Sequence, residues 1–219
     1  EKINDVQNQV SKEEKMLIKS LIFIVATYLI GSIPTSYIMG KILKGIDIRK
    51  FGSGNVGATN ALRVLGTKIG ITTLLLDAAK GAVPVIIAKK FDFEGTVLVI
   101  IALSAILGHI FTIFLKFKGG KGVATSAGVF GALTPIPFCI ALASFILIVI
   151  FTKYISLGSI VSALILAISE LVINLQNNFA EREFLVFVSI IALLIIVRHK
   201  DNILRLKNGN ENKISFGKK

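Results

Sequence analysis

The chain of 219 residues is 53% hydrophobic and has a mean hydropathy of +0.78, which is more apolar than a water-soluble domain of this length needs to fill a core. Its formal charge of +12 does not indicate nucleic acid, because the basic residues stand between apolar segments. Anionic lipid or a phosphorylated substrate is the partner that this arrangement favours. The single cysteine, Cys139, excludes an internal disulfide, and its apolar surroundings predict a buried thiol.

Residues 1–15 are polar, mixed in charge and followed by Met16, a candidate translation start. They lack the composition of a cleavable signal peptide, so we expect a disordered or artefactual tail. We expect residues 16–219 to form a single transmembrane domain, because the sequence shows no internal repeat and no soluble second domain.

Seven apolar segments are candidates to cross a hydrocarbon core, which needs roughly 20 helical residues. They are residues 17–40, 69–88, 96–115, 122–133, 136–152, 157–173 and 184–197. The fourth is short and ends at Pro135 and Pro137, which permit a turn but no continuous helix. The sequence therefore predicts an all-α integral membrane protein with seven transmembrane helices, the fourth of half length.

Seven crossings place the two termini on opposite sides of a membrane. The loops after the first, third and fifth segments then share a side with the C-terminus, and that side carries 17 of the 25 Lys and Arg residues. Lys80 lies within the second segment. The positive-inside rule predicts a multi-pass membrane protein with its N-terminus outside and its C-terminus in the cytoplasm.

The loop after the first segment carries a glycine-rich cluster, GSGNVGATN. It matches G-x-G-x-x-G formally, but the dinucleotide fingerprint requires a βαβ unit, which the sequence does not predict here. Glycines let successive backbone N–H groups turn toward one anion, and polar side chains add donors. We expect phosphate binding here, with a helix-capping turn as the alternative. The candidates are Gly52, Ser53, Gly54, Asn55, Gly57, Thr59 and Asn60, with the guanidinium groups of Arg49 and Arg63 on either side.

A second cluster, Gly119, Gly120, Lys121 and Gly122, directly precedes the fourth segment. Its spacing is not that of a Walker A motif, which excludes a P-loop NTPase. Because a helix begins here, its free N–H groups and positive dipole end would face an anion held by Lys121. The alternative is an ordinary basic loop on the cytoplasmic side.

A third cluster, Arg198–Asn202, follows the last segment. His199 and Asn202 are three residues apart and so share a helix face, where the histidine could donate to phosphate or act as a general base. A histidine without a functional role is the alternative.

Two further polar positions lie within apolar segments. For His109, near the second cluster, a structural hydrogen bond is as good an interpretation as a functional one. Asp77 and Lys80 lie three residues apart inside the second segment, and we expect a mainly structural pair.

The sequence lacks the residues of a magnesium site and of two common catalytic motifs. On the predicted cytoplasmic side the acidic residues are Asp47, Asp201 and Glu211, too few and too scattered for a carboxylate-bound magnesium site. We therefore expect no metal and no cofactor. Neither histidine begins an H-x-x-x-x-D acyltransferase pattern, and no G-x-S-x-G elbow stands in a strand–turn–helix context.

These motifs together resemble the bacterial membrane acyl-phosphate:glycerol-3-phosphate acyltransferase family. The resemblance covers Met16 to Glu211. It is carried by GSIP from Gly31, DIRKFGSGNVGATN from Asp47, LDAAKG from Leu76, GHIF from Gly108, KFKGGKGVATS from Lys116, YISLGS from Tyr154 and RHKDNI from Arg198.

The resemblance implies a seven-span enzyme that transfers an acyl group from acyl phosphate to glycerol 3-phosphate, giving lysophosphatidic acid and phosphate. It implies catalytic positions at Ser53, Arg63, Lys121, His199 and Asn202, and a structural role for Glu211. Partners would be the two substrates and membrane lipid, and a further candidate is the soluble enzyme that supplies acyl phosphate. The rival hypothesis is an organic-phosphate transporter, although transporters usually bind near the membrane midplane between repeats.

Overall fold

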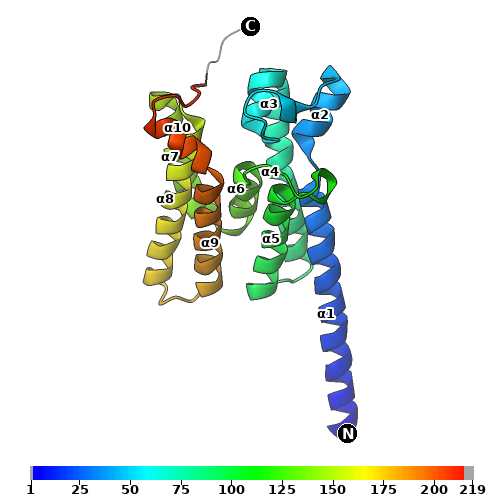
Figure 1. The fold of residues 1–219 in the computed structure, drawn as a ribbon. Coiled ribbons are helices and arrows are strands. Elements are labelled where there is room, and N and C mark those ends of the chain that lie inside the picture. Colours follow the sequence, from blue (N-terminus) through cyan, green and yellow to red (C-terminus); the bar gives the residue numbers. More distant parts are fainter. Residues whose placement is uncertain (1, 215–219) are drawn as a thin grey trace.

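The computed structural model describes residues 2–214, without the side chains of residues 2–4, 6, 8 and 9 (Figure 1). Within this range every regular element is a helix, so the predicted all-α class is confirmed. The α-helices are α1 (Lys2–Ser32), α2 (Thr35–Lys44), α3 (Ala58–Leu65), α4 (Thr67–Lys90), α5 (Gly95–Ile110), α6 (Val123–Leu133), α7 (Pro135–Thr152), α8 (Ile155–Gln176), α9 (Arg182–Arg198) and α10 (Lys200–Lys207). Two short 3-10 helices, η1 (Ile48–Lys50) and η2 (Ile113–Leu115), lie in the loops.

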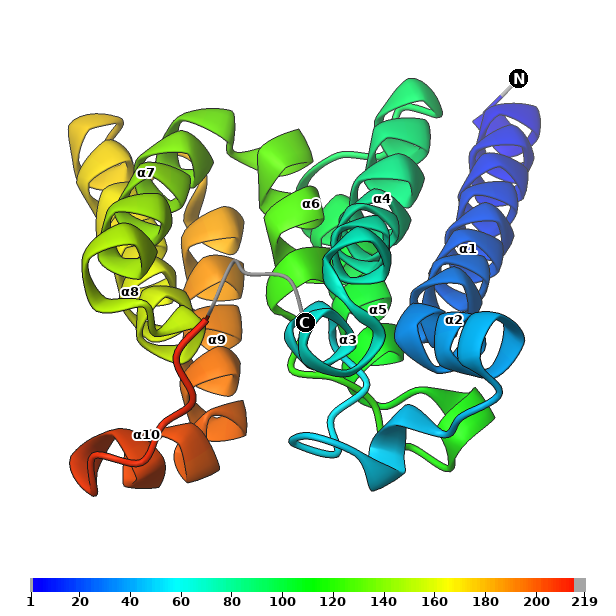
Figure 2. The same cartoon turned by 90° about the horizontal axis from the view of Figure 1, so that it is seen from above.

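The helices form two groups with α6 between them (Figures 1 and 2). One group contains α1 to α5 and the other α7 to α10. A common apolar core joins the groups, because fully buried side chains from α5, α6 and α9 belong to one cluster, among them Ile106, Phe130 and Ile191. The loops that carry the three polar clusters lie toward one end of the molecule, the end opposite the N-terminus (Figure 1).

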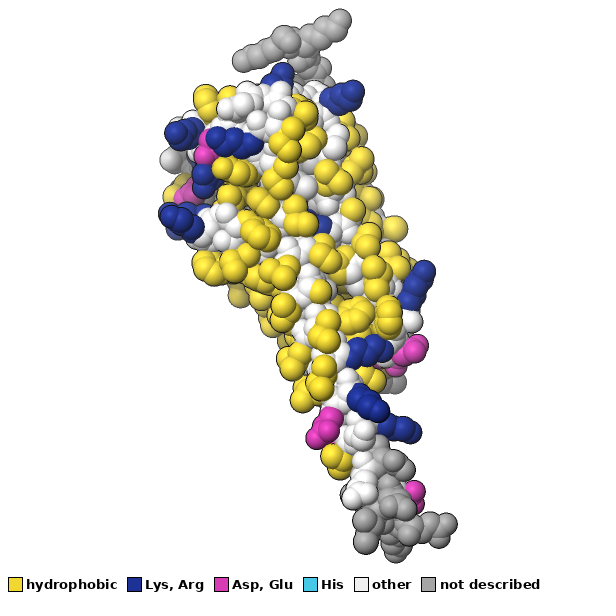
Figure 3. Space-filling model, turned by 90° about the vertical axis from the view of Figure 1, so that its right-hand side faces the viewer, with side chains coloured by type: hydrophobic (Ala, Val, Ile, Leu, Met, Phe, Trp, Pro, Cys, Tyr) yellow, Lys and Arg dark blue, Asp and Glu magenta, His cyan; other side chains and the backbone are white. Residues whose placement is uncertain are grey.

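The surface fits a protein that lies in a membrane. Five helical stretches are long and apolar enough to cross one: Val10–Ser32, Thr67–Lys90, Gly95–Leu115, Pro135–Thr152 and Ile155–Gln176. Figure 3 shows hydrophobic side chains over the middle of one face, with Lys and Arg mostly toward its two ends. The fourth segment forms the short helix α6, which ends before Pro135 as expected. The seven crossings and their orientation stay predictions.

The first predicted segment, residues 17–40, is not one helix. α1 ends at Ser32, and α2 begins only at Thr35. Proline has no backbone N–H and disfavours helical geometry in the residue before it, so Pro34 interrupts the helix. The third segment, residues 96–115, is similarly divided, because α5 ends at Ile110 and η2 follows.

Two smaller expectations also differ from the structure. Helix α1 extends back to Lys2, so residues 2–15 are helical where we expected disorder, while a domain boundary at residue 16 stays a prediction. Cys139 is exposed on the apolar surface rather than buried. Lys218 and Lys219, which entered the charge comparison, lie outside the described residues.

Glycines bring α1 and α5 into backbone contact. A Cβ atom on Gly31 would overlap the carbonyl group of Ala105, and one on Gly108 would overlap the carbonyl oxygen of Tyr28. The Tyr28 hydroxyl also donates to the Phe111 carbonyl at 2.6 Å, just beyond the end of α5. This packing fixes the end of α5, from which the second cluster continues.

We expect Gly31→Val to destabilise the protein by about 1–3 kcal/mol, because the added side chain forces α1 away from α5. Thermal unfolding in detergent measures the effect. Gly131→Ala on α6 is the matched control, since its Cβ would make an ordinary contact, 3.4 Å from the Phe138 ring. Equal losses in the two variants would contradict the close packing of α1 and α5.

Candidate active site

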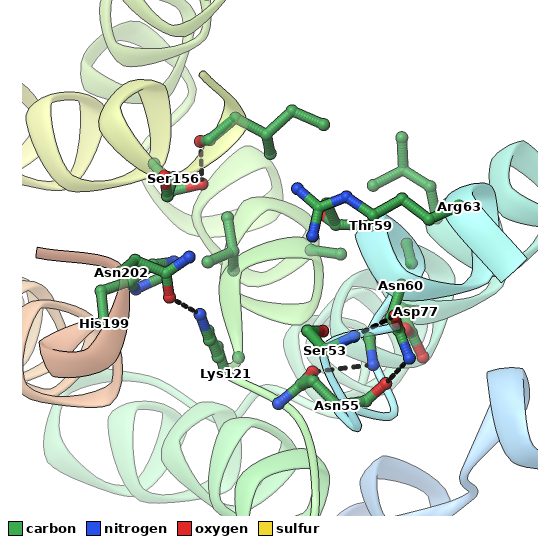
Figure 4. Close-up of a pocket in the computed structure, with 18 of the residues that line it drawn as sticks. Ser53, Asn55, Thr59, Asn60, Arg63, Asp77, Lys121, Ser156, His199 and Asn202 are labelled. Carbon is green, nitrogen blue, oxygen red and sulfur yellow. Dashed lines mark hydrogen bonds between the residues drawn. The ribbon is translucent and has the colours of Figure 1, made fainter. Parts of the chain in front are cut away.

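All three polar clusters line one cavity of about 120 Å³ (Figure 4). It includes every residue expected to be catalytic: Ser53, Arg63, Lys121, His199 and Asn202. Of the ten further phosphate-binding candidates, Asn55, Gly57, Thr59, Asn60 and Gly122 also line the cavity, whereas Arg49, Gly52, Gly54, Gly119 and Gly120 do not. The convergence of the clusters is therefore a property of the fold, although half of these candidates serve other purposes.

Asn60 organises the first cluster from inside. Its side-chain amide donates to the carbonyls of Asn55 at 2.9 Å, Phe51 at 3.1 Å and Ile48 at 3.3 Å, and its Oδ1 accepts the Ser53 N–H at 2.9 Å. The side chain is almost fully buried. These bonds satisfy the backbone polar groups of an irregular loop, which leaves the Ser53 side chain at the cavity wall.

The predicted phosphate contacts from Arg49, Gly52 and Gly54 are not supported by their positions. The Arg49 guanidinium forms an ion pair with Asp47 at 2.7 Å and lies over the Tyr37 ring, away from the cavity. Gly52 and Gly54 have φ of +60° and +69°, a left-handed backbone that glycine adopts readily, but neither lines the cavity, and the Gly54 N–H donates to the Phe51 carbonyl at 3.0 Å.

The second cluster is anchored on the end of α5. The N–H groups of Gly119 and Gly120 donate to the carbonyls of Ile110 and His109 at 3.0 and 3.1 Å, so they are not free for an anion. Neither glycine has room for a Cβ atom against His109 and Ile110. Their role is close packing, which corrects the predicted phosphate contacts at these two positions.

Two helix N-termini open onto the cavity. Gly122 precedes α6, and Val123 and Ala124 of its first turn line the cavity. Gly57 precedes α3, and Ala58 and Thr59 of that first turn line the opposite wall. The first N–H groups of a helix have no intrahelical partner and carry the positive end of its dipole. Both walls therefore favour an anion between them.

Lys121 lies between the two helix groups and donates a hydrogen bond to Oδ1 of Asn202 (Figure 4). Partial burial, together with the nearby charge of Arg205, lowers the pKa of Lys121 to about 8. Among the described residues no carboxylate forms an ion pair with Lys121 or with Arg63. The cavity thus contains two cations that a bound anion can neutralise.

Arg63 reaches the cavity from α3 on the wall opposite Asn202 (Figure 4). Its guanidinium donates to the Asn212 carbonyl at 3.3 Å, in the segment that follows α10. Burial lowers the pKa of Arg63 from its usual value, but an arginine stays charged at physiological pH.

Glu211 holds the third cluster in place. Its Oε1 accepts hydrogen bonds from Asn202 at 2.8 Å and from the Ser156 hydroxyl at 3.0 Å, and its Oε2 pairs with Arg205 at 2.7 Å. Burial alone would raise the pKa of Glu211, but these donors together hold it below its ordinary value. The network orients the Asn202 amide so that its oxygen meets Lys121, in agreement with the structural role expected for Glu211.

The ring of His199 has a defined tautomer. Nδ1 lies 2.7 Å from the Ile195 carbonyl, which can only accept, so Nδ1 carries the proton and Nε2 keeps its lone pair. Burial, with the charge of Lys121 as the next cause, lowers the pKa of His199 to about 4. The ring is therefore neutral near pH 7.

Asp77 and His109 also line the cavity, next to the first cluster. Asp77 pairs with Lys80 at 2.8 Å, which confirms the expected ion pair. Sequence reasoning missed Ser156 and Ser159, which line the cavity from α8, and Arg205 behind Glu211. The YISLGS run contained the signal for both serines, because it places two hydroxyl groups three residues apart at the start of an apolar helix.

No group of three or more His, Cys, Asp or Glu side chains that could hold a metal ion occurs within the described part of the chain. Of the two carboxylates that line the cavity, Glu211 receives donors on both oxygens, from Asn202, Ser156 and Arg205, and Asp77 receives Lys80 and Thr35 on Oδ1.

Comparison with known proteins relates the site to one family. The family model described as "Glycerol-3-phosphate acyltransferase" matches residues 21–209. A glycerol-3-phosphate acyltransferase of Fusobacterium nucleatum is 50% identical over 196 residues, which cover 89% of this chain and 97% of the relative. A glycerol-3-phosphate acyltransferase of Chlorobaculum tepidum is 45% identical over 227 residues, covering 91% of this chain and 98% of the relative.

Two solved structures show the same fold. Both are crystal structures of PlsY (YgiH), described as an integral membrane glycerol 3-phosphate acyltransferase. The glycerol 3-phosphate form has a TM-score of 0.83 and is 38% identical, and the lysophosphatidic acid form has a TM-score of 0.80 and is 37% identical. Each alignment covers 90% of this chain and 96% of the solved one.

Proposed function

The chain belongs to the glycerol-3-phosphate acyltransferase family and is an integral membrane acyltransferase, and we propose that it transfers a fatty acyl group from acyl phosphate to glycerol 3-phosphate. The products are lysophosphatidic acid and inorganic phosphate, in phospholipid synthesis. The observation that carries this proposal is a cavity between the N-termini of α3 and α6 that contains two cations, Arg63 and Lys121, which form no ion pair within the part of the chain that the structure describes.

Both proposed substrates carry a phosphate, which fits a cavity with two cationic groups on two walls. Lys121 and the N-terminus of α6 form one candidate phosphate position, and Arg63, Ser53 and the N-terminus of α3 form the other. Apolar side chains of Leu74, Phe145 and Ile155 complete the lining. They would receive the first part of an acyl chain that continues among the helices.

The reaction needs positioning more than a covalent nucleophile. Acyl phosphate is a mixed anhydride with phosphate as its leaving group. A hydroxyl oxygen of glycerol 3-phosphate attacks the acyl carbon, the ester C–O bond forms, and the bond from that carbon to the phosphate oxygen breaks. Cationic and N–H donors stabilise the negative charge that develops on the acyl oxygen and on the departing phosphate. Held side by side, the substrates react without a metal or cofactor.

The hydroxyl proton goes to phosphate, and His199 orients the hydroxyl. With a pKa of about 4, His199 is a weak base, whereas a phosphate monoester has a second pKa near 6. The free lone pair on Nε2 can accept a hydrogen bond from the attacking hydroxyl, which points its oxygen at the acyl carbon. This assigns proton transfer to the substrate and alignment to the enzyme.

The decisive experiment mixes purified protein with palmitoyl phosphate and glycerol 3-phosphate in detergent and measures lysophosphatidic acid. We expect turnover that is unchanged by EDTA. Palmitoyl-CoA should fail as a donor, because the cavity needs a phosphate on the acyl carbon to hold it. Comparable rates with palmitoyl-CoA would contradict the proposed donor, and EDTA inhibition that Mg²⁺ reverses would contradict metal-free transfer.

Lys121→Ala should lower kcat/KM by roughly 10²–10³-fold, the usual effect of removing one preorganised charge. Lys118→Ala is the matched control, because Lys118 lies in the same loop but is exposed and does not line the cavity. It should change the rate little. If both variants lose activity equally, the second cluster contributes only its overall charge, and the assignment of Lys121 to the site is wrong.

The affinity for glycerol 3-phosphate should fall as the pH rises above about 8. The pKa of Lys121 is lowered, so its ammonium group is present below that pH and is lost as the pH rises through it. We expect the KM to increase by about tenfold per pH unit beyond this point. In Lys121→Arg, whose charge persists, any remaining activity should lose this dependence. A wild-type KM that stays flat to pH 10 would contradict the shift.

The site should face the cytoplasm, where we propose both phosphorylated substrates are made. Single cysteines at Phe51 and Lys118 in a Cys139→Ala background should resist a membrane-impermeant maleimide in intact cells and react in inverted vesicles. A cysteine at Asp92, exposed at the other end of the bundle, should do the reverse. Labelling of Phe51 and Lys118 from opposite faces would contradict a one-sided site and favour a transporter.

A further inference from the structure

The break between α1 and α2 exposes backbone carbonyls that receive hydrogen bonds from α4 and from the loop after α5. Because α1 stops at Ser32, the carbonyls of Ser32 and Ile33 have no helical partner within an apolar bundle, where an unsatisfied carbonyl is costly. The Ile33 carbonyl accepts the N–H of Thr35, two residues on, at 3.1 Å. Lys80 of α4 donates to the Ile33 carbonyl at 2.7 Å, and the Thr112 hydroxyl donates to the Ser32 carbonyl. Lys80 is thus tied to the break as well as to Asp77.

Asp77 holds the other side of the same break. Its Oδ1 accepts a hydrogen bond from the Thr35 hydroxyl in the first turn of α2, while it pairs with Lys80. The ion pair on α4 therefore contacts the chain on both sides of Pro34. It fixes where α1 ends and where α2 begins.

Helix α2 is hydrogen-bonded in turn to the first cluster. The Ser36 hydroxyl, one residue after Thr35, donates to the Val56 carbonyl at 2.5 Å. Ser36 is fully buried and Val56 is nearly so. Val56 lies between Asn55 and Gly57, which both line the cavity. A displacement of α2 would therefore move the wall that carries Ser53 and the N-terminus of α3.

Asp77 also lies near His109, which packs against the second cluster. Nδ1 of His109 lies 3.7 Å from Oδ1 of Asp77, and the His109 ring occupies the space that a Cβ atom on Gly120 would need. The His109 carbonyl accepts the Gly120 N–H at 3.1 Å, and the Gly120 carbonyl accepts from Arg198 at 3.1 Å. Asp77 thus stands between the loop before α3 and the loop before α6.

We propose that the Asp77–Lys80 pair is a positioning unit that sets the first and second clusters at the separation that two substrate phosphates require. The inference rests on the proposed function. A pair that only stabilised the bundle would need no partners beyond α4, and apolar residues often replace a buried ion pair without loss of stability. This pair instead bonds to Thr35 and to the Ile33 carbonyl at the α1–α2 break, and Asp77 lies beside His109. Its charges act through Thr35, Ser36 and His109, not by touching a reacting atom.

A matched comparison is available within the chain. Glu170 and Asn174 on α8 are as buried as Asp77 and bond to each other at 3.2 Å, but neither lines the cavity. The test variants are Asp77→Leu/Lys80→Met, which removes the ion pair, and Ser36→Ala, which keeps the pair but removes its link to the first cluster. Glu170→Leu/Asn174→Leu is the control for the loss of a buried polar pair.

The first measurement does not depend on catalysis. Cysteines at Phe51 and Lys118, both exposed positions, carry spin labels in a Cys139→Ala background. Pulsed electron paramagnetic resonance then measures the distance between the two loops. We expect a broader or shifted distance distribution in Asp77→Leu/Lys80→Met and in Ser36→Ala, and the wild-type distribution in the α8 control. Unchanged distances in both test variants would overturn the proposal.

The second measurement separates positioning from stability. The KM for glycerol 3-phosphate should rise by about tenfold in Ser36→Ala, the scale of one buried hydrogen bond, and the loss of that bond should lower the unfolding temperature by only a few degrees. A lower unfolding temperature with an unchanged KM would show a purely stabilising role and overturn the proposal. If Asp77→Leu/Lys80→Met does not fold, Ser36→Ala and Thr35→Val decide the question. If the wild-type protein makes no lysophosphatidic acid, the proposed function fails, but the distances still test the positioning role.

Discussion

The site depends on positive charge that the protein itself leaves uncompensated. Arg63 and Lys121 face a partly buried cavity where a lone cation is disfavoured, as the lowered pKa of Lys121 shows. The two carboxylates that line the cavity pair with other cations: Asp77 pairs with Lys80, and Glu211 pairs with Arg205. A bound anion therefore gains the interaction that the empty site lacks. The buried ion pairs keep these carboxylates engaged, which favours an anion over a cation between Arg63 and Lys121.

Glycines contribute to this site mostly by shape. The sequence suggests two glycine-rich nests whose N–H groups would all point at phosphate. In the structure, the N–H groups of Gly119 and Gly120 donate to carbonyls at the end of α5, and Gly52 has the left-handed backbone of a turn in the first loop. The free donors belong instead to the first turns of α3 and α6, which the glycines before them place at the cavity. The helix ends offer the free donors, and the glycine loops bring those ends together.

Much of this arrangement could be predicted from the sequence, because it follows from local patterns. Apolar length indicated most of the helices, clustered Gly, Lys and His residues indicated the three polar loops, and the family resemblance implied the residues expected to be catalytic. What differs from the structure depends partly on tertiary contacts, such as the bonds from Gly119 and Gly120 to the end of α5, and partly on near neighbours in the sequence. Arg49 was expected at phosphate, yet it forms an ion pair with Asp47, two residues before it, a local partner that Arg63 lacks. The end of α1 at Ser32 follows from Pro34 and was missed because the apolar run continues past it.

The contacts across the cavity are suited to exchange with substrate. Three polar bonds join the walls at the site end: Lys121 to Asn202, Arg198 to the Gly120 carbonyl, and Arg63 to the Asn212 carbonyl. The acceptors are neutral, whereas a phosphate oxygen is charged and makes a stronger hydrogen bond with the same cations. Phosphate can therefore replace the acceptors of Lys121 and Arg63 without leaving a buried donor unsatisfied. The apolar core shared by α5, α6 and α9 does not take part in this exchange, so it can hold the two helix groups together while the polar contacts change.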